Sequence, residues 1–361
     1  MKPLSKRGLL SLVLVAALVV AFGTPGVTRA AKYTMVIAHH YPVDMTNNEV
    51  HPSLVRFANI VQTQTKGAIE VKIFGGMTLG TEIEYTQKAQ KGKTVQSAVL
   101  SSGAFSSFFP KYQVITTPFL FSDYNVAWAF FNSRWYADFM NEMRQKTGLR
   151  WIGMFDDGGG FVAFTNNKRL IKTPKDMKGL RIRVEENPAH IAMMEALGAK
   201  AVPLEWGQVP TALQTGVADG QFNAPGLNAA MKFWEPCDYT SWTGHVYNSL
   251  NWVVNDEWFK GLPEEYQRVI LRAARQAVMM GHGVSEFLTV LGWKTCCEKF
   301  KACYVPTPDE KAAFRDIMRP AFYKWATEEF GLKPEFIHET WNKVEEISKA
   351  LDAEYMEKWG R

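Results

Sequence analysis

Two arginines occupy alternate positions in a short apolar segment, GLRIRV, at residues 179–184. If this segment is a β-strand, its apolar side chains lie on one face, and Arg181 and Arg183 lie together on the other. A guanidinium group stays charged and carries forked hydrogen-bond donors, so one that is buried needs an anion beside it. The segment therefore predicts an anion site, filled either by a carboxylate of the protein or by a ligand.

The residues after the two arginines suggest where the site lies. Asn187 and Pro188 are typical of a helix start, and the apolar spacing carries that helix to about residue 197. The arginines then stand near the carboxyl end of a strand, the edge at which α/β sheets bind ligands. From the residues alone the anion stays undecided. The internal candidates are three acids: Asp156, Asp157 and Glu205.

Catalytic and metal chemistry find little support. The sequence has no GxSxG, no HExxH and no phosphate-binding glycine loop. His39, His40 and His51 invite a zinc interpretation, but adjacent residues of a strand point to opposite faces, so we expect no metal site. We expect no cofactor either, and a periplasmic enzyme is only a remote alternative.

The first thirty residues predict a signal peptide. Basic Lys2, Lys6 and Arg7 precede an apolar run over residues 8–22, and small residues lead to a cleavage site after Ala30. An uncleaved membrane anchor is the alternative, although the apolar run is short for a membrane span. We therefore expect an exported, periplasmic protein.

Charge and cysteine content narrow the class. The whole chain has 41 basic and 36 acidic residues, a formal net charge of +5. Removing residues 1–30 takes away four basic residues and leaves 37 against 36, so nothing suggests nucleic acid or an anionic membrane as a partner. A bridge from Cys237 to one of the cysteines at 296–303 and buried free thiols are both compatible with the four cysteines.

Strand and helix patterns alternate along the chain and predict an α/β fold. Strands at 33–40, 68–74 and 94–102 enclose helices at 54–67 and 81–92, a βαβαβ unit with a mostly parallel sheet. A long aromatic helix is expected at 124–147 and a strand at 149–155. A second series begins at about residue 161. An apolar helical pattern over 263–302 is about 60 Å long at ~1.5 Å per residue, so we expect it to span both halves.

The run MKGLRIRVEENPAHIAMMEALGAKAVPLEWGQVPTALQTGVADGQFNAPGLNAAMKFWE (177–235) resembles the signature region of the solute-binding proteins of tripartite ATP-independent periplasmic (TRAP) transporters, the DctP family. GGMTLGTE (75–82), TNNKRLIKTPKDMKG (165–179) and NDEWFKGLPEEYQ (255–267) agree in order and spacing.

The resemblance implies a two-lobed periplasmic binding protein with a central ligand cleft, a long helix crossing the hinge and a helical C-terminus. We expect lobe I at 31–157 and about 249–288, lobe II at 158–248 and about 289–340, and a C-terminal helix at 341–361.

The resemblance also implies which residues bind. Arg183 matches the family's arginine that pairs with a substrate carboxylate, and a planar fork can make two parallel hydrogen bonds to one. Trp206 matches a pocket aromatic and Asn223 a carboxylate-binding asparagine, whereas Arg181 is expected nearer solvent. The other predicted ligand-binding residues are Glu82, Ser101, Ser102, His40, Tyr41, Phe161, Asn187 and Asp157. For three positions a structural role is the alternative: core packing for Trp206, a turn for Asn223 and a helix cap for Asn187.

The expected function follows from the resemblance. The protein captures a small organic acid and delivers it to the small and large membrane subunits of a TRAP transporter. Many relatives have a second arginine in the strand that here reads GGGFVAFTNN (158–167), which has none. We therefore favour a monocarboxylate with an apolar or aromatic body. A hydroxy- or keto-acid, a sulfonate and an ectoine-like zwitterion remain alternatives, as does service to a sensor or an ATP-driven importer.

Overall fold

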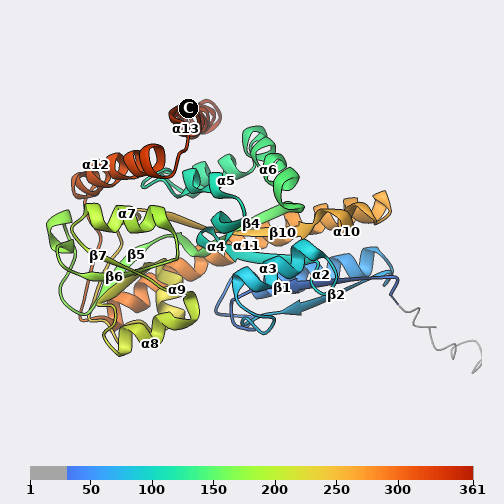
Figure 1. The fold of residues 1–361 in the computed structure, drawn as a ribbon, viewed down its shortest axis with the longest axis horizontal. Coiled ribbons are helices and arrows are strands. Elements are labelled where there is room, and N and C mark those ends of the chain that lie inside the picture. Colours follow the sequence, from blue (N-terminus) through green and yellow to red (C-terminus); the bar gives the residue numbers. More distant parts are fainter. Residues whose placement is uncertain (1–30, 361) are drawn as a thin grey trace, which may run out of the picture.

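The computed structural model describes residues 31–360, so the predicted signal peptide lies outside the described residues. The chain folds around two β-sheets that lie side by side, with one long helix, α11 (Glu264–Lys299), running beneath both (Figure 1). No helix within residues 31–360 is both long and apolar enough to cross a membrane. The predicted α/β class is confirmed.

The first sheet has the strand order β2-β1-β3-β10-β4. Its strands are β1 (Tyr33–Ala38), β2 (Ile69–Phe74), β3 (Ser97–Ser101), β4 (Leu149–Phe161) and β10 (Tyr247–Asn255). The β1, β2 and β3 strands are parallel, which confirms the predicted βαβαβ unit. The sheet is mixed, however, because β10 returns from much later in the chain and runs antiparallel between β3 and β4.

The second sheet has the order β11-β9-β5-β8-β6-β7. Its strands are β5 (Ala163–Asn166), β6 (Arg181–Val184), β7 (Lys200–Pro203), β8 (Gly220–Asn223), β9 (Tyr239–Ser241) and β11 (Ala302–Tyr304). The strand β6 lies parallel to both β7 and β8, so the carboxyl ends of these three strands meet at one edge. The two sheets are joined through β4 and β10, which pair as far as Phe161 and Tyr247. Both strands thus run past the predicted lobe boundaries at 157 and 249.

Helices cover both sheets. The α-helices before the second sheet are α2 (Val50–Gln64), α3 (Glu82–Lys91), α4 (Ser102–Phe108), α5 (Tyr124–Phe131) and α6 (Arg134–Thr147). Those that follow are α7 (Pro188–Ala196), α8 (Val209–Gln214), α9 (Pro225–Ala230), α10 (Asp256–Lys260), α11, α12 (Pro308–Lys324) and α13 (Pro334–Trp359). Short 3₁₀ turns are η1 (Pro110–Thr116), η2 (Pro174–Met177) and η3 (Trp206–Gln208), and a π-helical turn, η4 (Trp325–Glu329), ends α12.

Strand alternation places two apolar cores on opposite faces of the first sheet. In β3, Val99 packs in the core under α2 and α11, while Ala98 and Leu100 pack in the core on the other face, where α3 and α4 lie. The second core continues beneath α7 and α12. These helices belong to the second half of the molecule, which is built on the second sheet, whereas the first half is built on the first sheet. The sheets are thus fixed from both sides, which positions the strand ends that carry the polar residues.

Helix α11 comes unusually close to both halves because glycine replaces larger residues on its inner face. A Cβ atom at Gly281 would lie 2.5 Å from the ring of Phe155, and one at Gly292 would lie 2.6 Å from the carbonyl oxygen of Pro225. Gly281 and Gly292 are therefore contact points of the helix, whereas Gly283 faces open space. The helix contacts α2 and β4 in the first half and α9 in the second, as expected.

Three predicted elements differ in the structure. The helix expected at 124–147 is two helices, because α5 ends at Phe131 and Ser133 caps a new one, α6, by accepting a hydrogen bond from the backbone of Tyr136. Strand β4 continues through residues 158–160, since these glycines adopt φ angles of 59°, 121° and 69° that other residues avoid. The last helix begins at Pro334, seven residues earlier than expected.

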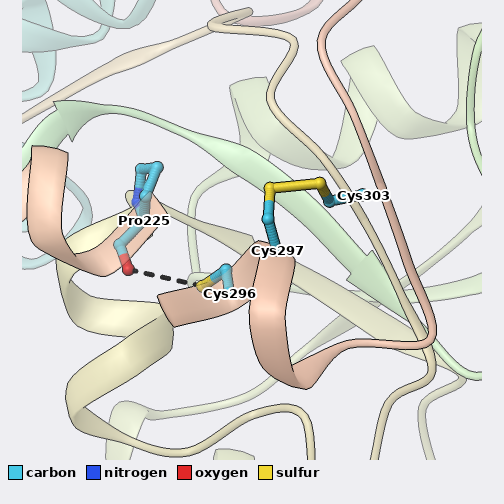
Figure 2. The surroundings of a disulfide bond; sticks show 4 residues. All are labelled: Pro225, Cys296, Cys297 and Cys303. Carbon is cyan, nitrogen blue, oxygen red and sulfur yellow. Dashed lines mark hydrogen bonds between the residues drawn. A yellow bond between two sulfur atoms is a disulfide. The ribbon is translucent and has the colours of Figure 1, made fainter. Parts of the chain in front are cut away.

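The structure shows which cysteines are bonded and rules out one of the two alternatives left by the sequence. Cys297 and Cys303 form a disulfide between the end of α11 and β11 (Figure 2). Cys237 and Cys296 are free and buried. A bridge to Cys237 is therefore wrong. The reason is helical geometry: neighbouring residues of α11 point in different directions, so Cys296 faces the carbonyl of Pro225 at 3.8 Å while Cys297 faces β11.

Candidate functional site

A cavity opens where the carboxyl end of β6 faces the strand ends and helix starts of the first sheet. The first half contributes His40, Met77, Thr81, Glu82, Ile83, Ser101, Gly103, Ala104, Ser107 and Asp157 to its lining, and the second half contributes Arg183, Glu185, Glu186, Leu204, Glu205, Trp206, Asn223 and Leu227. Its volume is about 90 Å³. At the ~10–15 Å³ that one water needs on this measure, the cavity holds roughly six to nine waters, the size of a small organic molecule.

Arg183 is the buried cation of this cavity. Its side chain lies at the end of β6 with 4% of its surface exposed, and its Nε and Nη2 donate to the carbonyl oxygen of Leu204 at 3.0 and 2.7 Å. The guanidinium carbon lies 5.9 Å from the ring centre of Trp206. Within the described residues no carboxylate comes within 4.0 Å of it. Burial lowers the pKa of Arg183, and the surrounding acids counteract that effect.

Arg181, two residues earlier, has a different environment. It forms a forked ion pair with Asp219, at 3.1 Å from Nε and 2.7 Å from Nη2, and 43% of its side-chain surface is exposed. The expectation that Arg181 lies nearer solvent is confirmed. The internal acids considered for Arg183 do not pair with it. Asp156 is instead bound by Trp128 and His282, at 3.0 and 2.9 Å.

On the opposite wall, His40 and Glu82 form a pair. Their Nδ1 and Oε1 atoms lie 3.2 Å apart, and Glu82 also accepts hydrogen bonds from the backbone and hydroxyl of Ser101, at 2.6 and 3.1 Å. Burial alone would lower the pKa of His40, but Glu82 reverses this and the pKa of His40 is raised. Burial would raise the pKa of Glu82, yet His40 and Ser101 hold it below its ordinary value. The charges of this pair therefore satisfy each other.

Two further carboxyl groups face the cavity without such a partner. Asp157, which is 5% exposed, accepts a hydrogen bond from the hydroxyl of Tyr41 at 2.7 Å through Oδ1 only. Glu185 has a buried oxygen, Oε2, that accepts no side-chain hydrogen bond. Burial raises the pKa of both groups, in the case of Glu185 to about 7. The site therefore holds two carboxyl groups whose charged forms are destabilised by burial.

Asn223 is oriented by a chain of buried amides. Gln221 uses its Nε2 to donate to Thr165 and Asn228, at 2.8 and 2.9 Å, so its oxygen accepts a hydrogen bond from Nδ2 of Asn223. Asn228 in turn donates to the backbone oxygen of Asn223 at 2.9 Å. Asn223 keeps one N–H and its side-chain oxygen for the cavity. An amide N–H of this kind can bind the second oxygen of a carboxylate at Arg183.

The structure brings seven of the eleven predicted residues into the cavity lining: Arg183, Asn223, Trp206, Glu82, Ser101, His40 and Asp157. Four lie elsewhere. Tyr41 stands behind Asp157, and Ser102 donates to the carbonyl oxygen of Ser249 at 3.0 Å. Phe161 packs against other aromatic rings, and Asn187 caps α7 by accepting a hydrogen bond from the backbone N–H of Ala189 at 3.0 Å.

Sequence reasoning missed Glu185 as a site residue. Its signal was its position directly after β6, at the edge where ligands bind. Leu204 also lines the cavity, and its backbone oxygen accepts the hydrogen bonds of Arg183. A backbone contact of this kind cannot be predicted from the residue type. Of the three histidines considered for a metal, His39 and His51 contact each other, with Nε2 and Nδ1 3.1 Å apart, and His40 pairs with Glu82. No group of three or more metal-binding side chains occurs in residues 31–360.

Comparison with known proteins gives one consistent family. Residues 42–329 match the sequence profile of DctP, bacterial extracellular solute-binding protein, family 7. The 2,3-diketo-L-gulonate-binding periplasmic protein YiaO of Escherichia coli is 30% identical over 237 residues, which cover 66% of this chain and 71% of that protein. The C4-dicarboxylate-binding periplasmic protein DctP of Vibrio cholerae is 24% identical, over 78% of this chain and 84% of that one.

A solved structure extends the likeness to the fold. The TRAP periplasmic solute-binding protein of Polaromonas sp. JS666, bound to D-erythronate, superimposes with a TM-score of 0.77 at 26% identity. The superposition covers 86% of this chain and 98% of that chain. The two-lobed architecture is thus common to both proteins.

Proposed function

Because the chain belongs to family 7 of the bacterial extracellular solute-binding proteins, the DctP family, we propose that it is the solute-binding subunit of a TRAP transporter and that Arg183 anchors the carboxylate of a small organic acid. The relatives named above are binding proteins and not enzymes. The mechanism is noncovalent: the cleft captures the acid, the two halves enclose it, and the loaded protein docks on the permease. The permease supplies the energy for transport.

One observation supports the anchor above all others. Arg183 is almost fully buried, faces the cavity and has no carboxylate partner in the described protein. A buried guanidinium group without an anion is unfavourable, so the state that satisfies it is the ligand-bound one. The N–H of Asn223 and the ring of Trp206 extend the same subsite, by a second hydrogen bond and by a flat apolar wall.

The body of the ligand is less apolar than the sequence suggested. Trp206 is the one aromatic residue of the cavity lining, because Tyr41 and Phe161 lie outside it. The remaining lining is rich in carboxyl groups, a serine pair and a threonine. The cavity therefore favours an organic acid whose body carries hydrogen-bond donors, as D-erythronate does in the similar Polaromonas protein.

Two parts of the assignment are proposals by family alone. The partners are the small and large membrane subunits of the transporter, and the location is the periplasm, reached by the predicted signal peptide at residues 1–30. Deletion of the genes for those subunits should abolish uptake of the ligand even when the binding protein is abundant.

A thermal-shift screen of residues 31–361 tests the binding function. The protein is first unfolded and refolded to remove bound molecules. It is then screened against monocarboxylates, dicarboxylates, hydroxy- and keto-acids, amino acids and sulfonates. A ligand at ~100 times its dissociation constant stabilises the folded state by about 2.7 kcal/mol, several degrees in a chain of this size. The shift should vanish in Arg183→Ala and persist in Arg181→Ala. A thermal shift that is unchanged in Arg183→Ala, or the absence of a shift with any acid, contradicts the proposal.

A further inference from the structure

The charges around the cavity do not balance, even when a ligand carboxylate is included. Five acids line it: Glu82, Asp157, Glu185, Glu186 and Glu205. Against them stand two basic side chains, Arg183 and His40. A simple organic acid placed on Arg183 adds one more negative charge to a site that already has an excess of them.

Neither basic side chain is free to offset the excess. His40 is held by Glu82 at 3.2 Å, and the bound acid takes Arg183. A third base, His190, lies with its Nδ1 3.8 Å from Oε2 of Glu185, but burial lowers the pKa of His190 to about 3, so it is neutral. Arg183 acts on both buried carboxyl groups, and His40 acts on Asp157, but within residues 31–360 neither Asp157 nor Glu185 forms an ion pair within 4.0 Å with a charged base.

These two carboxyl groups also have unused hydrogen-bonding capacity. Asp157 is nine-tenths buried and lines the cavity, yet only its Oδ1 is bonded, to the hydroxyl of Tyr41. Glu185, directly after β6, reaches towards the first half, where an added Cβ at Gly103 would lie 2.8 Å from its Oε2, and this oxygen has no hydrogen-bond partner. Asp157 comes from the first half and Glu185 from the second, so a donor between them is held from both sides.

We propose that the ligand is a zwitterion: an organic acid that also carries a cationic nitrogen, with its carboxylate on Arg183 and its cationic group between Asp157 and Glu185. The inference rests on the proposed binding function and narrows its substrate class. A cationic nitrogen supplies both missing features, a positive charge and N–H donors, beside buried carboxyl groups whose unpaired charge is unfavourable. Hydroxyl groups supply donors alone, so a hydroxy-acid would force one of the two acids to take up a proton.

Calorimetry with matched ligands tests the inference. The probes are C4–C6 acids that share one carbon skeleton and carry an amino group, a hydroxyl group or hydrogen at the same position, with the amino group placed α, β or γ to the carboxylate. The best amino form should bind at least ~10-fold more tightly than its hydroxy and unsubstituted counterparts at neutral pH. Titrations in buffers of different ionisation enthalpy should show no proton uptake for the amino form.

Variants assign the effect to the two acids. Asp157→Asn and Glu185→Gln should each reduce the preference for the amino form by about 10-fold, because each removes one of the charges that hold the cation. Glu195→Gln, which changes an exposed acid of α7 outside the cavity lining, is the matched control and should alter it by less than about 2-fold.

The outcomes separate this inference from the binding function. If the hydroxy or unsubstituted acids bind as tightly as the amino forms, or if no amino form binds, the inference is overturned. The proposed function survives that result as long as some acid binds in a manner that depends on Arg183. Binding of amino forms that is unaffected by both acidic substitutions also overturns the inference.

Discussion

The two ends of β6 present the same residue type in opposite circumstances. At its beginning, Arg181 and Asp219 make a complete forked pair near the surface. At its end, Arg183 and Glu185 lie in one cavity, and Arg183 has no carboxylate partner within 4.0 Å. The pKa values of the two neighbouring acids differ accordingly. The pKa of Asp219 is lowered, because the bonds to Arg181 outweigh burial, whereas burial raises that of Glu185 to about 7. A completed pair indicates structure, and an incomplete one indicates a place kept for a ligand.

Removing Arg183 is the most severe test of that contrast. Arg183→Ala should weaken ligand binding by about 2–5 kcal/mol, since it leaves the ligand carboxylate buried and unpaired. The melting temperature of the ligand-free protein should stay within a few degrees of wild type, because Arg183 makes no ion pair within 4.0 Å in the described residues. Calorimetry and thermal melts measure both. An unfolded variant, or an equal loss of affinity in Arg181→Ala, would remove the distinction between the two ends.

The pH dependence of stability should have opposite signs at the two acids. Glu185 has a folded pKa of about 7 against 4.5 in the unfolded chain, so its carboxyl binds protons more tightly in the folded state. The ligand-free protein should therefore lose on the order of 2 kcal/mol through this group as the pH rises from about 4.5 to 7. Glu185→Gln should flatten that part of the profile in urea titrations; an unchanged slope would contradict it. Asp219, with its lowered pKa, should act in the other direction and lose its contribution as the pH falls below 3.8.

Breaking the completed pair should affect folding and spare binding. Asp219 is 5% exposed and accepts from the backbone N–H, Nε and Nη2 of Arg181. Asp219→Asn should reduce the free energy of unfolding by about 1–2 kcal/mol, because charge-assisted hydrogen bonds become neutral ones. Urea denaturation measures this loss, and the dissociation constant of the ligand should remain within about 2-fold of wild type. A large change in affinity would show that the two ends of β6 are coupled.

The smallest effects distinguish fork geometry from charge. Arg183→Lys keeps a positive charge but loses the two parallel donors, so ligand affinity should fall about 10-fold. Arg181→Lys, at the exposed end, should change the free energy of unfolding by about 0.5 kcal/mol or less. Equal behaviour of the two lysine variants, in binding and in stability, would mean that the forked geometry at Arg183 carries no special role.

The sequence predicted what local patterns determine. Alternation in β6 placed both arginines on one face, and the cap formed by Asn187 and Pro188 placed the next helix correctly. The resemblance selected Arg183 over Arg181, a choice that strand periodicity could not make, because period two treats these positions alike. What separates them is Asp219, a residue 38 positions after Arg181 in the chain.

The errors have a common physical origin in contacts between distant parts of the chain. Phe161 was expected in the cleft, but β10 brings Tyr247 against it, with ring centres 5.0 Å apart. Glu185 was missed because its raised pKa comes from burial and from the nearby acids Asp157 and Glu82, which lie on β4 and α3 of the other half. Cys237 could not be excluded as a bridge partner without knowing which way Cys296 and Cys297 point from α11.

Helix α11 limits how such a chain can be recombined. One continuous element, with Gly281 fitted against Phe155 and Gly292 fitted against Pro225, forms the inner surface of both halves. A chimaera that takes one half from a relative inherits a helix whose other end was shaped for a different neighbour. Crossover points inside residues 264–299 are thus unfavourable. Substitutions where α11 packs must remain compatible with both halves, whereas the ligand-facing residues of each half are free to change independently.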